Sequence, residues 1–191
     1  MRVRKLIPGL ALLLGACGYN SIQQMDETAG AAKQQIAVML QRRADLVPNL
    51  VNTVKGYAAQ EAEVFEKVAQ ARAGLAGAVS GGNVGEMANA NQAMTGALGR
   101  LLAISENYPT LKSDQNFLRL QDELVGTENR IAQARTDYNG AVENYNAFIR
   151  KFPQVLTAKV AGAKPREYFD VTNPGAREAP TVDFTKTPAK P

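Results

Sequence analysis

The chain of 191 residues contains no histidine and no tryptophan, and it contains a single cysteine. The absence of histidine removes the usual general base, the commonest metal ligand and the usual switch near neutral pH. With one cysteine and no histidine, neither a zinc site of Cys and His ligands nor a Ser-His-Asp or Cys-His catalytic group can be built. The sequence therefore predicts no metal, no cofactor and no enzyme of these classes. Because a single cysteine cannot form a disulfide bond within the chain, packing alone has to stabilise the fold.

Phosphate-binding loops are absent as well. The chain has no GxxxxGK[ST] sequence, and the glycine-rich stretch 81–85 lacks the preceding strand that a dinucleotide site needs. A pair of carboxylates such as Glu106 and Glu123 could in principle cleave a glycosidic bond. Because nothing in the spacing selects this pair, a carboxylate-based envelope hydrolase is only a residual alternative to the expectation that the protein is not an enzyme.

The single cysteine, Cys17, follows a short targeting pattern. An apolar run occupies residues 6–14, the small residues Gly15 and Ala16 follow it, and the run is preceded by the basic residues Arg2, Arg4 and Lys5. This order is typical of a signal peptide, and its ending in cysteine resembles a bacterial lipoprotein signal. We therefore expect residues 1–16 to be removed and the Cys17 thiol to carry lipid.

Lipid on Cys17 also predicts where the protein resides. Several acyl chains hold a protein at a membrane without a spanning helix, so the membrane is an expected partner and the cell envelope the expected location. Gly18 follows the cysteine in place of aspartate, which in a Gram-negative host is typical of the outer membrane, facing the periplasm. An uncleaved span is disfavoured because the apolar run is about half of the roughly 20 residues needed to cross a bilayer.

The positive charge of the chain depends largely on this signal. The whole chain has 22 Lys and Arg against 18 Asp and Glu, and removal of the signal leaves 19 against 18. A nearly neutral chain without a basic stripe argues against nucleic acid as a partner. The remaining residues, about 175, are enough for one domain with its own core.

A long helix is the clearest element that the hydrophobic spacing predicts. From residue 117 to residue 152, apolar or small residues recur at alternating spacings of three and four, which is typical of a helix that buries one narrow seam. Ser113 is the expected N-cap ahead of Asp114, and Pro153 is expected to stop the helix. The seam consists of Phe117, Leu120, Leu124, Thr127, Ile131, Ala134, Tyr138, Val142, Tyr145, Ile149 and Phe152.

The same spacing recurs nearer the N-terminus. One segment runs from residue 22 to residue 75 and contains Pro48, where we expect a kink rather than a break because no polar loop accompanies the proline. The glycine-rich stretch 77–85 should end this segment. A shorter helix follows, with one face made of Met87, Asn91, Met94, Leu98 and Leu101.

Prolines dominate the rest of the chain, residues 153–191. This tail is expected to be extended, with residues 181–184 either forming an edge strand or lying along the bundle, and with residues 185–191 disordered. The predicted fold class is all-α: an elongated antiparallel helical bundle over residues 17–152, with a long kinked first helix, a shorter second and a long third, followed by the extended tail.

Several ordered motifs stand out along the chain. They are QRRADLVPNLV (residues 41–51), VKGYA (54–58) with Glu61, ENYPTLK (106–112), LQDEL (120–124) with TENRI (127–131), AR (134–135) with YN (138–139), and YN (145–146) before FP (152–153). Together they resemble the LemA family of bacterial membrane-associated helical proteins, from Tyr19 to Phe184. The resemblance implies a helical bundle at a bacterial membrane and no established reaction. Members with an N-terminal transmembrane helix differ from this chain in anchoring only.

Charged residues of these motifs lie on or beside the apolar seams. An unpaired buried charge is costly, so these side chains should find partners. We predict a network that joins the first helix to the last and fixes their register; a partner or ligand site made by the same residues is the alternative. The candidates are Arg42, Arg43, Asp45 and Glu61 near the first seam and Glu128 and Arg135 near the last.

The Tyr-Asn pairs that begin at residues 19, 138 and 145 have two interpretations. The tyrosines fill the seam with the asparagines at its edge, or the pairs bind sugar by stacking and hydrogen bonding. For the whole protein we expect a non-catalytic interaction or scaffolding lipoprotein with an unidentified envelope protein as partner. A membrane-binding protein that shapes or stabilises the bilayer ranks second, because it needs a basic face with exposed Phe or Leu and the seam is narrow and mixed in charge.

Overall fold

The computed structural model describes residues 7–170, with side chains from Gly18 onward. Within that range every regular element is a helix, which confirms the all-α prediction. The side chain of Cys17, the candidate strand at 181–184 and the end of the tail at 185–191 lie outside the described residues.

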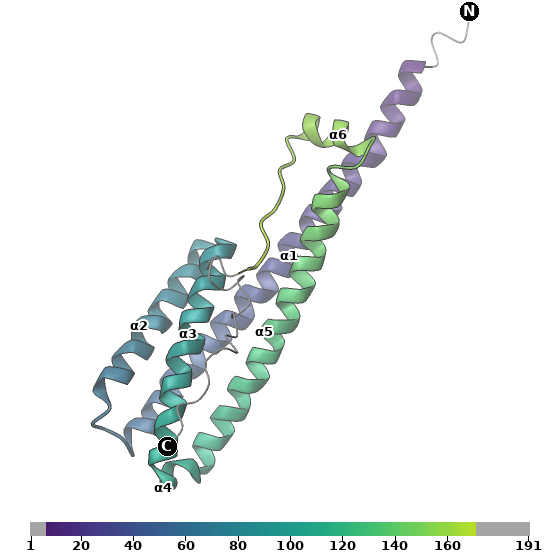
Figure 1. Cartoon of the computed structure of the whole chain (residues 1–191). Coiled ribbons are helices and arrows are strands. Elements are labelled where there is room, and N and C mark those ends of the chain that lie inside the picture. Colours follow the sequence, from purple (N-terminus) through teal and green to yellow (C-terminus); the bar gives the residue numbers. More distant parts are fainter. Residues whose placement is uncertain (1–6, 171–191) are drawn as a thin grey trace, which may run out of the picture.

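Two long helices run side by side for most of the molecule's length (Figure 1). The first, α1 (Ile7–Lys55), has 49 residues, which corresponds to about 73 Å at a rise of ~1.5 Å per residue. The other, α5 (Gln115–Phe148), returns antiparallel to it. The shape is therefore an elongated rod with the start of α1 at one end.

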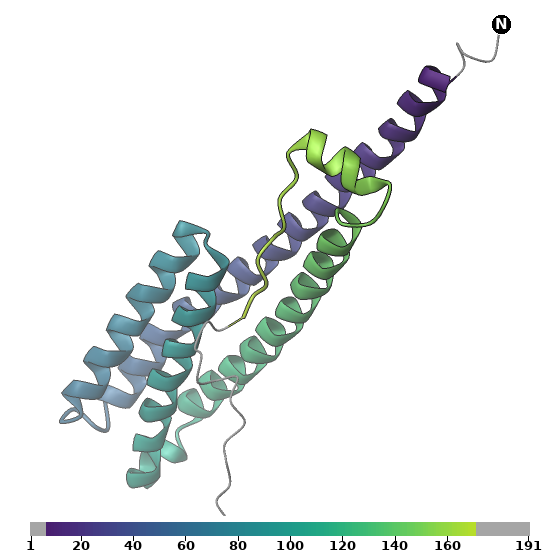
Figure 2. The ribbon, with the colours of Figure 1, turned by 45° about the horizontal axis from the view of Figure 1, so that its top comes forward.

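A second pair of helices covers only one half of this rod. The helices α2 (Ala62–Gly81) and α3 (Val84–Ile104) pack on each other and on the half of α1 that is distant from its start (Figure 2). A 3-10 turn (Ser105–Asn107) and the short α4 (Pro109–Lys112) then lead into α5. The antiparallel bundle is thus four helices thick at one end and thinner at the end where α1 starts.

The predicted seam of α5 forms much of the core. Most of its members are buried, including Thr127, and they pack against Ile36, Leu40 and Leu50 of α1. Phe152 is the clear exception, because α5 ends at Phe148 and leaves that ring exposed. The spacing therefore predicts the buried face of α5 correctly, but the predicted seam continues about one turn beyond the end of the helix.

The N-cap of α5 is Asp114, so the prediction of Ser113 was wrong. The Asp114 carboxylate accepts hydrogen bonds from the backbone N–H groups of Asn116 and Phe117, each at 2.9 Å. Ser113 has helical backbone angles and closes α4, with its hydroxyl donating to the Pro109 carbonyl oxygen. The bond from the Phe117 N–H, and then one from the Tyr57 hydroxyl, hold the pKa of Asp114 below its usual value. The loop after α1 is thereby tied to the start of α5.

The first long helix does not break at Pro48, but it ends sooner than predicted. Helix α1 continues through Pro48 to Lys55, and residues 56–61 reverse the chain before α2 begins. The predicted single segment from residue 22 to residue 75 is therefore two helices. Gly56 marks this end, where the N–H groups of Tyr57 and Ala58 both donate to the Val54 carbonyl oxygen.

Pro48 also creates a contact between α1 and α2. Proline has no N–H, so the carbonyl oxygen of Ala44, four residues earlier, has no helical donor. The Nε of Arg72 on α2 donates to that oxygen at 2.9 Å. The proline therefore provides the acceptor to which the second helix binds.

This arrangement predicts a measurable coupling between Pro48 and Arg72. Replacing Arg72 with Met should lower the free energy of unfolding by about 1 kcal/mol, the typical net value of one hydrogen bond. In a Pro48→Ala background the same change should cost much less, since the new N–H of residue 48 would take the Ala44 oxygen. Urea unfolding of the wild type, both single variants and the double variant gives the coupling; equal costs of Arg72→Met in the two backgrounds would contradict it.

The expectation of an extended tail from Pro153 was partly wrong. Residues 154–161 form α6 (Gln154–Ala161), a stretch without proline or glycine that ends at Gly162 in the left-handed conformation (φ 69°). Its Ala158 is buried against Ile22 of α1. Residues 163–170, which we call the strap, are then extended and run back along α5 (Figure 2).

Candidate functional site: a buried polar joint and a clamped strap

Arg43 is the most deeply buried charged side chain of the predicted set, with 6% of its side chain exposed. Its Nη1 lies 2.7 Å from the Glu128 Oε2 on α5 and donates to the Asn91 Oδ1 on α3 at 2.6 Å. These three residues, which we call the Arg43 joint, link α1, α3 and α5 at one level. The structure thus brings together Arg43 and Glu128, as the seam pattern predicted.

The electrostatics of the joint favour a fixed structural charge. Burial lowers the pKa of Arg43 from its ordinary value, and the neighbouring Glu128 charge offsets part of that effect. Guanidinium stays protonated under all ordinary conditions, so Arg43 neither gives nor takes a proton near neutral pH. Glu128 remains 42% exposed, so water also solvates it. The joint can therefore orient three helices around a fixed positive charge.

Four of the predicted network residues lie outside the joint; one of them, Arg135, contacts the strap and is described with it below. Arg42 is exposed, and the exposed Asp45 accepts a hydrogen bond from Gln41 one turn earlier at 2.9 Å. Glu61 is half-buried in the turn just before α2. Successive residues of a helix point about 100° apart, so Arg43 faces the seam while its neighbours at 42 and 45 point away from it.

Asn91 is the member of the joint that the sequence analysis missed. It was placed on the buried face of α3 but was not assigned to the network. A neutral amide on an apolar face gives no charge signal, although a buried amide has to find a hydrogen-bond partner. That requirement is the only sequence signal that could have found it.

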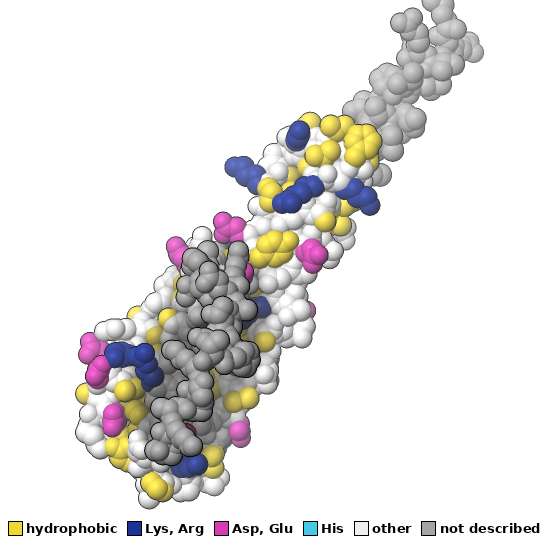
Figure 3. All heavy atoms as spheres, in the orientation of Figure 1, with side chains coloured by type: hydrophobic (Ala, Val, Ile, Leu, Met, Phe, Trp, Pro, Cys, Tyr) yellow, Lys and Arg dark blue, Asp and Glu magenta, His cyan; other side chains and the backbone are white. Residues whose placement is uncertain are grey.

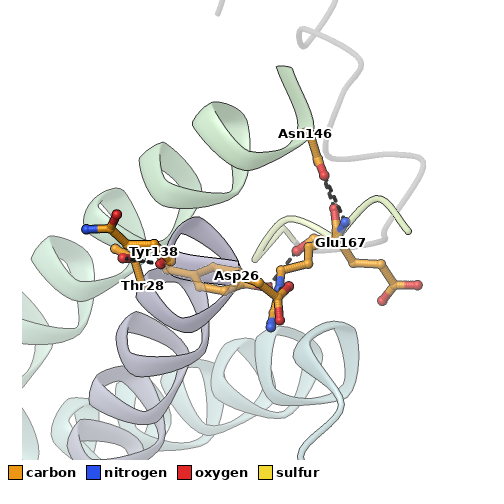
Figure 4. Close-up of polar contacts among 7 residues, drawn as sticks. Asp26, Thr28, Tyr138, Asn146 and Glu167 are labelled. Carbon is orange, nitrogen blue, oxygen red and sulfur yellow. Dashed lines mark hydrogen bonds and ion pairs between the residues drawn. The ribbon is translucent and has the colours of Figure 1, made fainter. Parts of the chain in front are cut away.

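The strap is clamped to α5 by two of the three Tyr-Asn pairs, those that begin at residues 138 and 145. The Asn146 side chain makes two bonds with the backbone of Arg166, donating to its oxygen at 2.9 Å and accepting from its N–H at 2.8 Å. Asn139 makes the same two bonds with the backbone of Phe169, at 3.3 and 2.8 Å. Figure 4 shows the Asn146 side chain directed from α5 toward the strap beside Glu167.

The spacing of the clamp fits the two conformations that it joins. Seven residues of helix rise about 10.5 Å, and three residues of extended chain span about 10 Å, so two amides seven apart on α5 can bind peptide groups three apart on the strap. Between them, the buried Tyr138 donates its hydroxyl to the Glu167 carbonyl oxygen at 2.7 Å. The side-chain amides of Asn139 and Asn146 therefore form hydrogen bonds within the chain, to the backbone of the strap.

Side chains of the strap complete its attachment. Phe169 is buried in the main core, and the Arg135 guanidinium lies over its ring at 5.3 Å from the centroid. Arg135 thus binds the strap rather than joining the Arg43 joint. Nearer the start of α1, the Arg166 Nε lies 2.7 Å from the Asp26 Oδ1, and this hydrogen bond holds the pKa of Asp26 below its usual value.

The surface hollows and exposed carboxylates lie apart from these contacts. A hollow of about 400 Å³ between α1 and α5 has no carboxylate in its lining, which is made of Met25, Thr28, Ala141, Asn144, Ala147, Phe148 and Lys151. Glu106 and Glu123 are both exposed, on the 3-10 turn and on α5. Among the described side chains, those of residues 18–170, no three His, Cys, Asp or Glu gather as metal ligands would. Over the same residues, no helix combines the length and hydropathy of a membrane span.

Comparison with known proteins relates this architecture to named relatives. Magnetosome proteins MamQ 1 and MamQ 2 of Paramagnetospirillum magneticum are each 33% identical to the chain over 174 residues, and MamQ of Magnetospirillum gryphiswaldense is 34% identical. Each alignment covers 79% of this chain and 64% of the relative, so the chain spans under two thirds of the length of these relatives. The LemA family model matches residues 32–184, a range that includes the Arg43 joint and the strap, and the chain belongs to the LemA family.

Proposed function

We propose that the protein is a non-catalytic scaffold of the bacterial cell envelope, held by lipid on Cys17 and presenting its helices to a protein partner. The observation that carries the proposal is the rod itself, in which α1 runs the full length and starts at one tip (Figure 1). Lipid on Cys17 would therefore hold the rod by that tip. The 39 residues from Cys17 to Lys55 rise about 57 Å, which separates the α2–α3 end from the anchor.

The use of the motif residues supports a role in architecture. Arg43, Glu128, Asn139 and Asn146 all bind other parts of the same chain. A rod whose helices and strap are fixed to one another can hold a partner at a set distance from a membrane. The relatives' names refer to the magnetosome and state no reaction, which is compatible with a scaffold.

Site-specific crosslinking in cells tests this function. A photo-crosslinking amino acid is placed at Gln70 on α2 or at Gln92 on α3, both exposed, with the exposed Val160 on α6 as the matched control. We expect the two distal positions to capture the same envelope protein, the control position not to capture it, and the product to disappear when Cys17→Ala removes the anchor. Absence of a common product from α2 and α3 would contradict the scaffold role.

The alternative of an envelope hydrolase predicts a different result. Purified protein would then release fragments from cell-wall glycan, and Glu106→Gln or Glu123→Gln would abolish the release while leaving the helical circular dichroism unchanged. We expect no fragments from either the wild type or these variants.

A further inference from the structure

The rod tip beside the start of α1 carries an unusual combination of exposed side chains. Val160 is 91% exposed, Phe152 76% and Leu156 57%, and these residues follow one another at intervals of four. Residues four apart in a helix lie on the same face, so Leu156 and Val160 share the outer face of α6 and Phe152 stands just before it. Single exposed apolar residues are common on proteins, but three on one short segment form a patch.

Cations surround this patch. Residues 148–165 contain no Asp or Glu, and their four cations, Arg150, Lys151, Lys159 and Lys164, are all exposed. Residues 18–25 of α1, which lie at the same end, carry no charge. The nearest acid on α1, Asp26, is paired with Arg166. Figure 3 shows Lys and Arg side chains gathered with hydrophobic ones at this end of the described residues.

Packing of the inner face of α6 against α1 and α5 fixes the position of its outer face. Ala158 is buried with Ile22, Tyr145 and Ile149 in a small core of its own. A Cβ added at Gly18 would come within 3.3 Å of the Thr157 hydroxyl oxygen, so the residue next to Cys17 lies directly against α6. The apolar patch, its cations and the expected lipid site are therefore at one tip.

We propose that this basic tip, made of Phe152, Leu156 and Val160 with Arg150, Lys151, Lys159 and Lys164, docks on the surface of an anionic bilayer. Apolar side chains flanked by Lys and Arg are the composition of helices that lie in a membrane interface. Phosphate headgroups attract the cations, and the apolar side chains enter the boundary with the acyl chains. The inference rests on the proposed anchor only for the orientation of the rod, since the patch and its charges belong to the folded chain.

Depth-dependent fluorescence quenching tests the docking on the full chain. The protein carrying Leu156→Cys is labelled with an environment-sensitive dye and added to vesicles of equimolar phosphatidylcholine and phosphatidylglycerol with brominated acyl chains. The matched control is Val125→Cys, which is 61% exposed on α5, in the half of the rod away from the tip. Quenching at position 156 but not at position 125 is the expected result; equal quenching at the two positions would overturn the proposal.

Charge variants test the recognition of anionic headgroups. Lys151→Glu with Lys159→Glu should reduce quenching at position 156 to the level of position 125, whereas Lys112→Glu with Arg119→Glu, exposed cations at the opposite end, should leave it unchanged. In vesicles of phosphatidylcholine alone the quenching should fall as well. Equal quenching in both vesicles, or no effect of the tip variant, would contradict an anionic docking surface.

The same samples separate this inference from the anchor. Wild-type chain is treated with the dye in parallel, and lipid on Cys17 should prevent labelling. If the wild type takes up dye, Cys17 carries no lipid and the proposed anchor is wrong. The docking proposal is still tested in that case, by comparing the quenching at positions 156 and 125 after subtraction of the signal from dye on Cys17.

Discussion

Replacing Glu128 with Ala is expected to lower the free energy of unfolding by about 2 kcal/mol, because Glu128 is the ion-pair partner of the buried Arg43 within the described residues. Removing one partner of a fully buried ion pair costs about 3–5 kcal/mol. The smaller value is expected here because Glu128 is 42% exposed and water screens its charge. Urea unfolding followed by circular dichroism measures the loss.

Two further variants distinguish a buried joint from a general loss of helix stability. Arg42→Ala, one residue away and exposed, should change stability by less than about 0.5 kcal/mol. Arg43→Met combined with Glu128→Ala should be less destabilised than the sum of the two single changes, since no charge is then left buried without its partner. A Glu128→Ala variant as stable as Arg42→Ala would show that the joint does not hold the helices together.

Replacing Phe169 with Ala is expected to release the strap from α5. Truncation of a fully buried Phe costs about 3–5 kcal/mol, and Phe169 is buried in the main core and supports Arg135. Because the strap is an extended segment that lies outside the helices, we expect local detachment at a cost of about 3 kcal/mol rather than unfolding of the bundle. Hydrogen exchange would detect it as lost protection of the Arg166 and Phe169 amides, which donate to Asn146 and Asn139.

Neighbouring positions provide the controls for the strap. Tyr168→Ala removes a ring that is about half exposed and should leave both amides protected. Asn139→Ala should expose the Phe169 amide more than the Arg166 amide, because each asparagine binds one of the two residues. Unchanged protection in Phe169→Ala would contradict the strap's dependence on its buried ring.

Much of the fold is predictable because the helices bury narrow seams. Positions such as Ile131 and Val142 repeat with the helical period, and their burial follows from that repeat. The pairing of Arg43 with Glu128 is predictable for a related reason, since charges on two buried faces have to compensate each other. Where each helix ends is harder to predict, because the turn after Lys55 contains Gly56 but no run of turn residues.

The strap and the basic tip could not be predicted from the same pattern. An extended chain has no helical period, so nothing in residues 163–170 indicates that Asn139 and Asn146 bind it. The prolines on either side of α6 led to the prediction of an extended tail. The helix between them, with Leu156 and Val160 on its outer face, was therefore not predicted. A membrane-binding surface requires exposed Phe or Leu beside basic residues. Phe152 and Leu156 are such residues, but only the fold shows that they are exposed together at one tip of the rod.

The most direct test of the lipid-anchored scaffold is the intact mass of the protein purified from bacterial membranes. Our proposal predicts a chain that begins at Cys17 and carries diacylglycerol and an N-acyl group. A chain that retains residues 1–16, or one with an unmodified Cys17, would contradict it and leave the rod without the anchor on which the proposed function depends.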